Sequence, residues 1–489
     1  MTFSNKITML SLVAFLTLGA QVALSAPAPG SNGLAARATT VTVNLGETHQ
    51  TMDGFGFSEA FGRAANLYNL PSAQRSHALD LLFSPTVGAG FTILRNRIGS
   101  GGSGDSIEPT APSSPSATPK YTWDHSEGYQ VWLSQQAKNL YNVTRFYANA
   151  WSAPGFMKTN GKDTNGGYLC GVTGEKCSSG DWRQAYANFL VQYIKNYASE
   201  GITITELGFL NEPDYVIIFV LSRYLTLFST SYSSMQSSGT QAADFIKILH
   251  PTLASAGLSV GINCCDMVGW NDQVTATVQL IAAGVENMIS RITSHGYSSD
   301  PKSPMDTKRP TWMTEIETTD AWNANWYQSG AKSEGFTWAQ LIYTAVVKAN
   351  VSAYFYWEGI EITTNNAGLI QISGTTVNPS ARLWAYGQWS RSVRPGAVRV
   401  GTSGAPSSVL TSAFKNTDGS VSVQMLNTGS TSQSVSIAIT GFTASTVKAY
   451  ITNQSNNGII STTASLSGGT VGATVPARSM MTFILTGGS

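Results

Sequence analysis

Between residues 53 and 393, the hydrophobic pattern alternates between short apolar runs and longer amphipathic segments. Short runs rich in β-branched and aromatic residues favour strands, whereas apolar residues spaced by three and four, as in Trp182–Ser199, favour helices. The predicted strands are 54–58, 92–98, 143–151, 204–211, 259–265, 289–297, 311–316 and 353–357. The predicted helices are 72–83, 129–140, 181–199, 239–256, 272–283, 338–349 and 380–392. Eight strands, most of them followed by a helix, predict an α/β fold, a (β/α)8 TIM barrel.

After about residue 396 the helical spacing disappears, and short runs rich in Val, Thr and Ser alternate with turns that contain Gly and Asn. These runs lie at 420–426, 432–439, 446–452 and 480–485. The pattern predicts a compact β-sandwich side domain over 396–489, beside a catalytic barrel over 39–395. Residues 39–50 begin with a strand-like run and could supply a further strand to the side domain.

The first residues have the pattern of a secretory signal peptide. Lys6 supplies positive charge, Ile7–Leu18 is an apolar run, and Ala23–Ala26 offers small residues for cleavage. We therefore expect residues 1–26 to be a signal peptide and 27–38 a loose leader. The apolar run is too short for a typical membrane span, so we expect the protein to be secreted and extracellular.

One apolar run does not fit the barrel pattern. Val216–Phe228 follows Asn211–Tyr215, where a loop at the mouth of a barrel should be polar. When these 13 residues are removed, Tyr215 joins Ser229 as an ordinary loop. We hypothesise that the run is translated intron from a mis-called splice boundary. The alternative is a hydrophobic hairpin packed on the barrel rim.

The composition limits the kinds of molecule that we expect the protein to bind. The formal net charge is +1 and 12% of residues are charged, which argues against nucleic acid or an anionic membrane because both need clustered basic residues. The 12 Trp and 19 Tyr residues either fill the core or stack on sugars. The sequence contains no His/Cys cluster that suggests a metal, so we expect no cofactor, and we expect a monomer.

The four cysteines and three sequons agree with secretion. Cys170 and Cys177 are seven residues apart and could close a local disulfide. Cys264 and Cys265 are adjacent; free buried thiols are favoured over a vicinal disulfide. The sequons that could carry glycans begin at Asn142, Asn350 and Asn453.

Two glutamates stand out as candidate catalytic residues. Glu212 follows the fourth predicted strand, and Glu315 ends the seventh. Because active sites of such barrels lie at the C-terminal strand ends, the two carboxylates could face each other, which is the minimal arrangement for cleaving a glycosidic bond. Glu212 could instead be a surface carboxylate in a turn. Glu317, two residues along the same strand face, competes with Glu315 as the nucleophile.

Five segments together resemble glycoside hydrolase family 30, most closely its fungal xylanase branch. They are Gln50–Ser58, Ala150–Lys158, Gly208–Pro213, Ser294–Tyr297 and Trp312–Glu315. The resemblance implies a retaining double displacement, with Glu212 as acid/base and Glu315 as nucleophile. The two carboxyl groups should then lie about 5 to 5.5 Å apart, against about 6.5 to 9.5 Å in an inverting enzyme.

The resemblance also implies roles for supporting residues. Asn211 should hydrogen-bond the sugar 2-hydroxyl, although it could simply form a turn. Tyr297 should hydrogen-bond the nucleophile, although it could be a core tyrosine. Arg95 could lower the pKa of the nucleophile or belong to a structural ion pair.

The resemblance also implies substrate contacts for three further residues. Trp151 and Trp357 could wall the subsite at the cleavage point, or could be ordinary core aromatics. Arg63, in the first loop, could bind a glucuronic acid branch through two parallel hydrogen bonds, or could be a solvated surface residue. Gly99–Gly104 matches GxGxxG, but a Pro/Ser-rich stretch follows it, so a loop beside the cleft is favoured over a phosphate site.

These features predict a secreted glycanase that cleaves β-1,4-xylan of the plant cell wall, with glucuronoxylan as the preferred form. Within the same family, the alternative is an endo-β-1,6-galactanase or a glucosidase-like enzyme. From a different class, the alternative is a non-catalytic carbohydrate-binding protein, against which both carboxylate positions argue.

Overall fold

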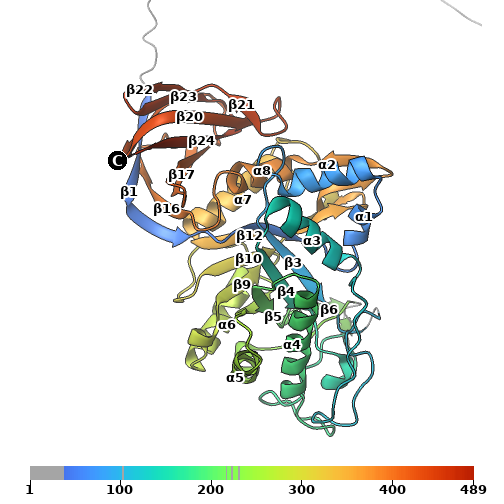
Figure 1. Ribbon diagram of the computed structural model, residues 1–489. Helices are drawn as coiled ribbons and strands as arrows, with labels where there is room; N and C mark the ends of the chain where they lie inside the picture. Colours follow the sequence, from blue (N-terminus) through green and yellow to red (C-terminus); the bar gives the residue numbers. More distant parts are fainter. Residues whose placement is uncertain (1–37, 102–103, 216, 222–223, 229–231, 489) are drawn as a thin grey trace, which may run out of the picture. The chain divides into compact units, whose positions relative to one another are not determined.

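The computed structural model describes residues 38–488 except 102–103, 216, 222–223 and 229–231, so the expected signal peptide lies outside the described residues. Eight parallel strands form a closed barrel (Figure 1), because each pairs with the next along the chain and the eighth, β12, also pairs with the first, β2. The strands are β2 (Gly54–Ser58), β3 (Ile93–Ile98), β4 (Arg145–Ala150), β5 (Glu206–Gly208), β8 (Gly261–Met267), β9 (Arg291–His295), β10 (Thr311–Glu315) and β12 (Val351–Glu361). The prediction of a (β/α)8 barrel is confirmed.

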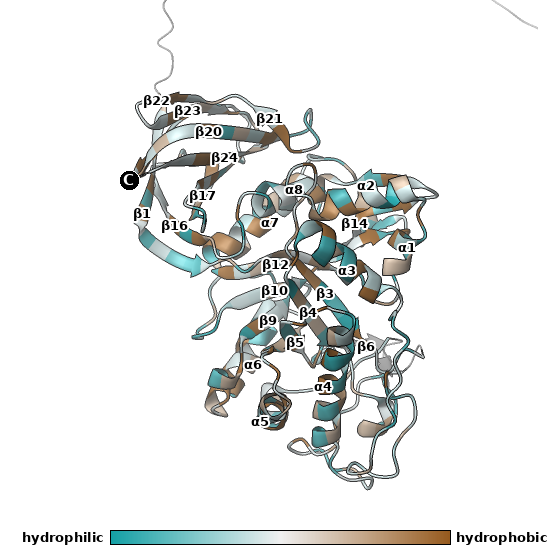
Figure 2. Cartoon of the chain, in the orientation of Figure 1, coloured by the Kyte–Doolittle hydropathy of each residue, from teal (hydrophilic) through white to brown (hydrophobic). Residues whose placement is uncertain are grey.

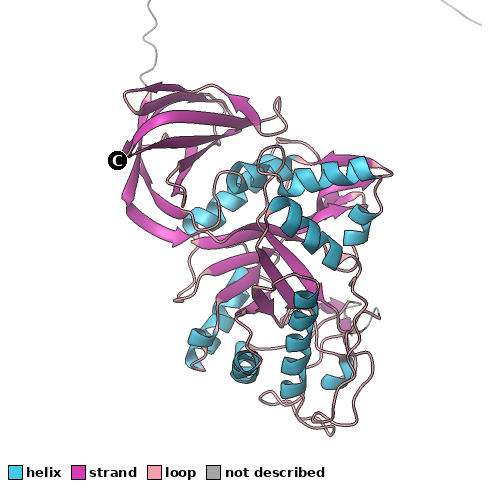
Figure 3. Ribbon diagram, viewed as in Figure 1, coloured by secondary structure: helices cyan, strands magenta, loops and turns pink. Residues whose placement is uncertain are grey.

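Helices surround this barrel (Figure 3) and present apolar faces to it. They are α1 (Ala64–Tyr68), α2 (Ser72–Phe83), α3 (Gln130–Tyr141), α4 (Arg183–Ser199), α5 (Gly239–Ser255), α6 (Trp270–Ala282), α7 (Gly335–Tyr343) and α8 (Ala381–Ser390). In α4, buried Tyr186, Leu190, Tyr193 and Tyr197 recur at spacings of three and four, as an amphipathic helix requires. Figure 2 shows the mixture of hydrophilic and hydrophobic residues on these helices.

Short elements decorate the barrel at several strand ends. Beyond β12, β14 (Gly368–Ser373) and β15 (Thr376–Pro379) extend the barrel sheet, and β11 (Thr318–Ala321) pairs with β13 (Asn365–Asn366). Short helices lie at Gly155–Met157, Glu286–Met288 and Thr344–Lys348. In the described residues no helix separates β9 from β10, so this connection is an irregular segment.

A second group of strands forms one ten-stranded sheet with its own apolar core, and the prediction of a β-rich C-terminal domain is confirmed. Its members are β1 (Thr39–Thr51), β16 (Val398–Ser403), β17 (Val409–Lys415), β18 (Val421–Asn427), β19 (Gln433–Thr440), β20 (Thr443–Thr452), β21 (Ile460–Thr462), β22 (Ser465–Ser467), β23 (Thr470–Val475) and β24 (Ser479–Gly488). Strand β1 lies between β16 and β19, so the residues before the barrel contribute to this sheet.

The unusual apolar run contains two strands. β6 (Ile217–Leu221) and β7 (Tyr224–Phe228) pair antiparallel and form a two-stranded sheet of their own. Residues 216, 222 and 223 of the run lie outside the described residues. Its origin as translated intron stays a prediction, which sequencing of the spliced transcript decides.

All four cysteines are paired. Cys170 and Cys177 form the expected local disulfide. Cys264 and Cys265 also form a disulfide, so the expectation of free thiols is wrong. The peptide bond between them is cis, and their Cα atoms are 3.0 Å apart. None of the described helices has the length and apolar character needed to cross a membrane.

Candidate active site

The two candidate glutamates meet at the C-terminal end of the barrel. Glu315 is the last residue of β10 and is buried, whereas Glu212 follows β5 in a left-handed conformation with φ 47°. The Glu212 N–H donates to the Asp266 carbonyl at 2.8 Å, which fixes the turn. One oxygen of each carboxylate and one ring nitrogen of His295 lie within 4.8 Å of one another. The ends of β5 and β10, the fourth and seventh barrel strands, therefore place both carboxylates at one point.

Glu315 is held by two donors. The Arg95 guanidinium donates to Oε2, and the Tyr297 hydroxyl donates to Oε1 at 2.9 Å. His295 Nδ1 lies 3.6 Å from Oε1. Burial raises the pKa of Glu315, and the positive charges of His295 and Arg95 oppose that effect. The two donors fix the carboxylate in one orientation and favour its ionised form.

Glu212 has a different set of partners. The Tyr232 hydroxyl donates to its Oε2 at 2.9 Å, and His295 Nδ1 lies 3.0 Å from its Oε1. Its side chain is 11% exposed, against 7% for Glu315. Glu212 is thus the more accessible of the two acids and shares His295 with Glu315.

Asp266 is a central residue of this site that the sequence analysis missed. It lies in β8 and is completely buried, with a left-handed φ of 52°. Its Oδ2 accepts from Arg95 Nη2, the Tyr147 hydroxyl and Asn149 Nδ2, each at 2.9 Å, and its Oδ1 accepts from the Thr314 hydroxyl at 2.7 Å. Burial alone would raise its pKa, but Arg95 and the nearby histidine lower it. Asp266 is therefore a fixed negative charge.

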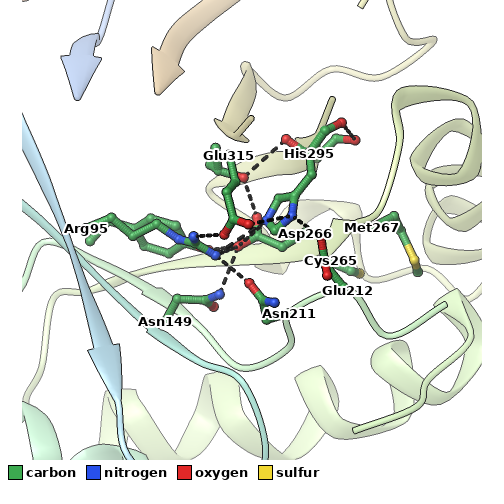
Figure 4. A network of polar contacts seen from close by, with 12 residues as sticks. Arg95, Asn149, Asn211, Glu212, Cys265, Asp266, Met267, His295 and Glu315 are labelled. Atoms are coloured by element: carbon green, nitrogen blue, oxygen red, sulfur yellow. Dashed lines mark hydrogen bonds and ion pairs between the residues drawn. The ribbon is translucent and has the colours of Figure 1, made fainter. Parts of the chain in front are cut away.

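His295 is the second missed residue, and Figure 4 shows it between the carboxylates. Its Nδ1 faces Glu212 and Glu315, and its Nε2 lies 3.8 Å from Asp266 Oδ2. Burial alone would lower the pKa of His295, but the three carboxylates outweigh it and raise the pKa to about 10. The imidazole is thus a cation near neutral pH. The segment Ser294–Tyr297 pointed to this strand end, but only Tyr297 was assigned a role.

The predicted supporting residues gather around the two acids. Asn211 Oδ1 accepts from Arg95 Nη2 at 2.6 Å. Trp151 lies under the Arg95 guanidinium, 4.4 Å from the ring centre. Trp357 lies inside the long strand β12 rather than at its end. They belong to a pocket of about 580 Å³, whose lining is Phe61, Arg63, Trp151, Asn211, Glu212, Tyr215, Tyr232, Val268, Tyr297, Glu315, Glu317, Thr319 and Trp357.

Arg63 lies in this pocket but is not simply solvated. Its Nε donates to Glu361, and Glu358 lies 3.6 Å from the same nitrogen. Its guanidinium also faces the Trp357 ring at 5.7 Å. The side chain is 29% exposed, so one edge of the guanidinium is held by carboxylates while the residue still lines the pocket.

Glu317, the rival nucleophile, also lines the pocket. Burial and the neighbouring charge of Glu315 raise its pKa to about 7. Its buried Oε2 has no hydrogen-bond partner among the described residues, whereas Glu315 is oriented by Arg95 and Tyr297. The structure thus orients Glu315 and leaves Glu317 without comparable support.

Glu212, His295 and Glu315 are also close enough together to serve as metal ligands. A histidine must be neutral at the ligating nitrogen to bind a metal. The raised pKa of His295 favours a proton on the ring, and Arg95 already supplies positive charge beside Glu315. The donor set therefore fits acid–base chemistry better than a bound cation.

Comparisons with known proteins cover both domains. The family model of glycosyl hydrolase family 59 matches residues 52–375, and that of the glycosyl hydrolase family 30 beta sandwich domain matches residues 396–483. Among solved structures, the catalytic domain of GH30 xylanase C from Talaromyces cellulolyticus is 52% identical. That match covers 91% of this chain and 100% of the other, with a TM-score of 0.86.

More distant relatives differ in their substrates. Endo-1,6-beta-D-glucanase neg1 of Aspergillus fumigatus is 24% identical, with 83% of this chain and 85% of that protein covered. Glucuronoxylanase XynC of Bacillus subtilis is 23% identical, with 94% of each chain covered. Similarity at this level spans hydrolases named for a β-1,6-glucan and for a glucuronoxylan.

Proposed function

Because the chain belongs to glycoside hydrolase family 30, we propose that it is a secreted retaining hydrolase that cleaves β-1,4-xylan. The observation that carries the proposed chemistry is the meeting of Glu212 and Glu315 in one pocket, with oxygens within 4.8 Å. So close an approach of two oxygens favours the short carboxyl spacing of retaining enzymes, about 5 to 5.5 Å, over the spacing of about 6.5 to 9.5 Å in inverting ones. The similarity to xylanase C supports xylan as the substrate.

In the first step, Glu315 attacks the anomeric carbon while Glu212 donates a proton to the departing glycosidic oxygen. The aglycone leaves, and the sugar stays bonded to the Glu315 carboxyl oxygen. In the second step, Glu212 removes a proton from water, which attacks the same carbon and releases Glu315. Arg95 and Tyr297 support the first step because they hold the nucleophile ionised and aimed.

The neighbouring residues would position the sugar. Arg95 holds Asn211 through its Oδ1, which leaves the amide nitrogen to donate to a sugar hydroxyl. Trp151 and Trp357 lie 6.0 Å apart between ring centres and wall the pocket with apolar surface. An apolar wall with a few convergent polar groups suits a sugar, which has an apolar face and a rim of hydroxyls.

Arg63 supports a glucuronic acid branch as part of the preferred substrate. Burial raises the pKa of Glu59 and Glu358 well above the usual range, which disfavours negative charge on these neighbours of Arg63. Arg63 donates from Nε to Glu361 and from Nη1 to the Ala60 carbonyl at 3.3 Å, so Nη2 is the nitrogen that could meet a substrate carboxylate. The second candidate function, cleavage of a β-1,6-glycan, is favoured by the similarity to the endo-1,6-glucanase.

Product analysis tests these proposals. Wild-type protein should release xylooligosaccharides from glucuronoxylan and from unbranched xylan, and should release little from β-1,6-galactan or β-1,6-glucan. Glu315→Ala should abolish release. Products from a β-1,6-glycan alone would replace xylan as the substrate, and full activity in Glu315→Ala would remove the proposed nucleophile.

A second comparison tests whether Arg63 binds a glucuronic acid branch of the substrate. Arg63→Ala should lower activity on glucuronoxylan more than activity on unbranched xylan, and equal losses on both would exclude the branch role. Arg75→Ala is the matched control, because Arg75 packs on Tyr68 and Trp132. We also propose secretion and cleavage after Ala26, which N-terminal sequencing of protein from the culture medium would test.

A further inference from the structure

A second cavity lies beside the catalytic pocket. It encloses about 380 Å³, within the size range of ligand sites, and its lining includes Arg97, Asp105, Trp123 and Gln130. Phe61 belongs to the lining of both cavities. The two spaces are therefore neighbours across one aromatic side chain.

Phe61 forms the wall between them. Its ring packs edge-on against Trp151 at 5.7 Å and Trp357 at 6.3 Å, both of which line the catalytic pocket. On the second cavity's side, the Arg97 guanidinium lies 4.2 Å from the centre of the same ring. A sugar chain leaving the catalytic pocket past Phe61 would thus meet the residues of the second cavity.

Most of the lining of this cavity comes from described residues of the long connection between β3 and α3, among them Gly99, Asp105 and Trp123. Connections longer than about 12 to 15 residues are uncommon and usually serve a function. Its described residues are well anchored, since Arg97 pairs with Asp105, the Thr122 N–H donates to the Ile107 carbonyl at 2.7 Å, and Trp123 Nε1 donates to Glu200 at 2.9 Å. This side of the cavity is therefore formed by residues that hydrogen bonds and an ion pair hold in place.

The side chains that line the cavity indicate which kind of ligand it fits. Trp123 is half-buried, and because its N–H is committed to Glu200, its orientation is fixed while the ring contributes to the cavity. Arg97 is already paired with Asp105 and donates to Ser233 at 2.9 Å, so it offers little to an anion. Asp124 adds a further acidic side chain to the lining. An uncharged, hydroxyl-rich ring fits this lining, and a glucuronate does not.

We propose that this cavity binds a neutral xylosyl unit of the substrate, more distant along the chain than the sugar at the cleavage point, with Trp123 as its stacking platform. This inference rests on the proposed xylanase function. It predicts that the enzyme gains from long substrates and that the gain depends on Trp123.

The test compares kcat/KM for xylohexaose with kcat/KM for xylotriose. In Trp123→Ala the ratio of the two should fall about tenfold, in line with the loss of one aromatic stacking contact. Trp132→Ala is the matched control, because Trp132 packs with Tyr68 and Arg75 instead, and its ratio should stay as in the wild type. An unchanged ratio in Trp123→Ala overturns the proposal.

Since Trp123 also packs against Tyr197, a second variant guards against a folding defect. Thr122→Trp adds bulk at an exposed residue of the lining and should lower the same ratio by blocking the cavity. If wild-type protein cleaves neither oligosaccharide, the proposed function fails and this inference falls with it. If the wild type cleaves both and the two variants keep its ratio, only the second site is refuted.

Discussion

The two ends of the barrel each carry a cluster of charges, and the clusters differ in their balance. At the N-terminal end, Asp53 accepts from Arg145 at 2.5 Å, from Arg291 at 2.8 Å and from Trp312 Nε1 at 2.8 Å. Glu206 lies 3.9 Å from Arg145 and 3.7 Å from Arg291. Two cations thus face two carboxylates.

At the C-terminal end, Arg95 and His295 face three carboxylates, those of Glu212, Asp266 and Glu315. Negative charge is in excess, and the cluster opens onto a pocket of about 580 Å³. A balanced network, in which each charge has an opposite partner, offers a ligand little surplus charge and stabilises the fold. An open network with surplus carboxylate can exchange a proton and attack a carbon, which suits the end of the barrel where active sites occur.

Removing Glu315, the proposed nucleophile, should separate the two ends most sharply. We expect Glu315→Gln to lower kcat on xylan by roughly 10⁴- to 10⁶-fold, because no other oriented carboxylate can form the covalent intermediate. The melting temperature should change little, since the variant removes surplus negative charge. Steady-state kinetics and calorimetry measure both. Glu317→Gln is the control, and a larger loss of kcat in that variant would reassign the nucleophile.

The next largest effect should come from Asp266, which acts through its neighbours. Asp266→Asn should lower kcat about 100-fold, because Arg95 and His295 lose the charge that positions them. Around His295, the other charged groups are Glu212, Glu315 and Arg95. Loss of Asp266 should lower the pKa of His295 from about 10, so the cation is lost at lower pH.

The pH profile distinguishes this role from a purely structural one. In Asp266→Asn, the alkaline limb of the kcat profile should move to lower pH. A fall in kcat with an unmoved alkaline limb would mean that Asp266 only supports the fold.

Much of this site could be predicted because it follows from strand positions. Glu212 and Glu315 come after the fourth and seventh apolar runs, and a closed barrel brings such ends together. The family resemblance suggested either a place for Arg95 beside the nucleophile or a structural ion pair, and Arg95 contacts both Glu315 and Asp266.

The rest depends on contacts between distant elements, which periodicity does not encode. Asp266 looked like any polar residue after a strand, yet its hydrogen-bond partners come from three other strands, β3, β4 and β10. Tyr232 reaches Glu212 from beyond β7. The pairing of the adjacent residues Cys264 and Cys265 is not revealed by any pattern of hydrophobic residues.

Substitutions at the N-terminal end of the barrel should lower stability and leave activity unchanged, the opposite of substitutions at the active site. Asp53→Ala should lower the free energy of unfolding by about 3 kcal/mol, because Arg145 and Arg291 lose their shared acceptor. Activity per folded molecule should be unchanged. Chemical denaturation measures the loss. Asp300→Ala, which removes an exposed pair with Lys302, should cost less than about 1 kcal/mol, and equal costs would contradict the comparison.

The smallest expected effect is a difference in how pH acts on the two ends. The pKa of Asp53 is lowered because its arginines outweigh burial, so its contribution to stability is present above its unfolded pKa of 3.8 and is lost as the pH falls through its folded value. The pKa of Glu317 is raised to about 7 by burial, so its contribution is complete below its unfolded value of 4.5 and is lost as the pH rises through about 7.

Glu317→Gln should therefore remove a decline in stability between about pH 4.5 and 7, on the order of 1 kcal/mol after allowance for partial exposure. Asp53→Asn should instead flatten only the acid side of the same curve. Unfolding free energies measured across this pH range in both variants provide the check. If the decline in stability persists in Glu317→Gln, it does not come from the Glu317 carboxyl group. Glu317 would then be ionised in the folded protein across this pH range, and it would add one negative charge to the active-site end.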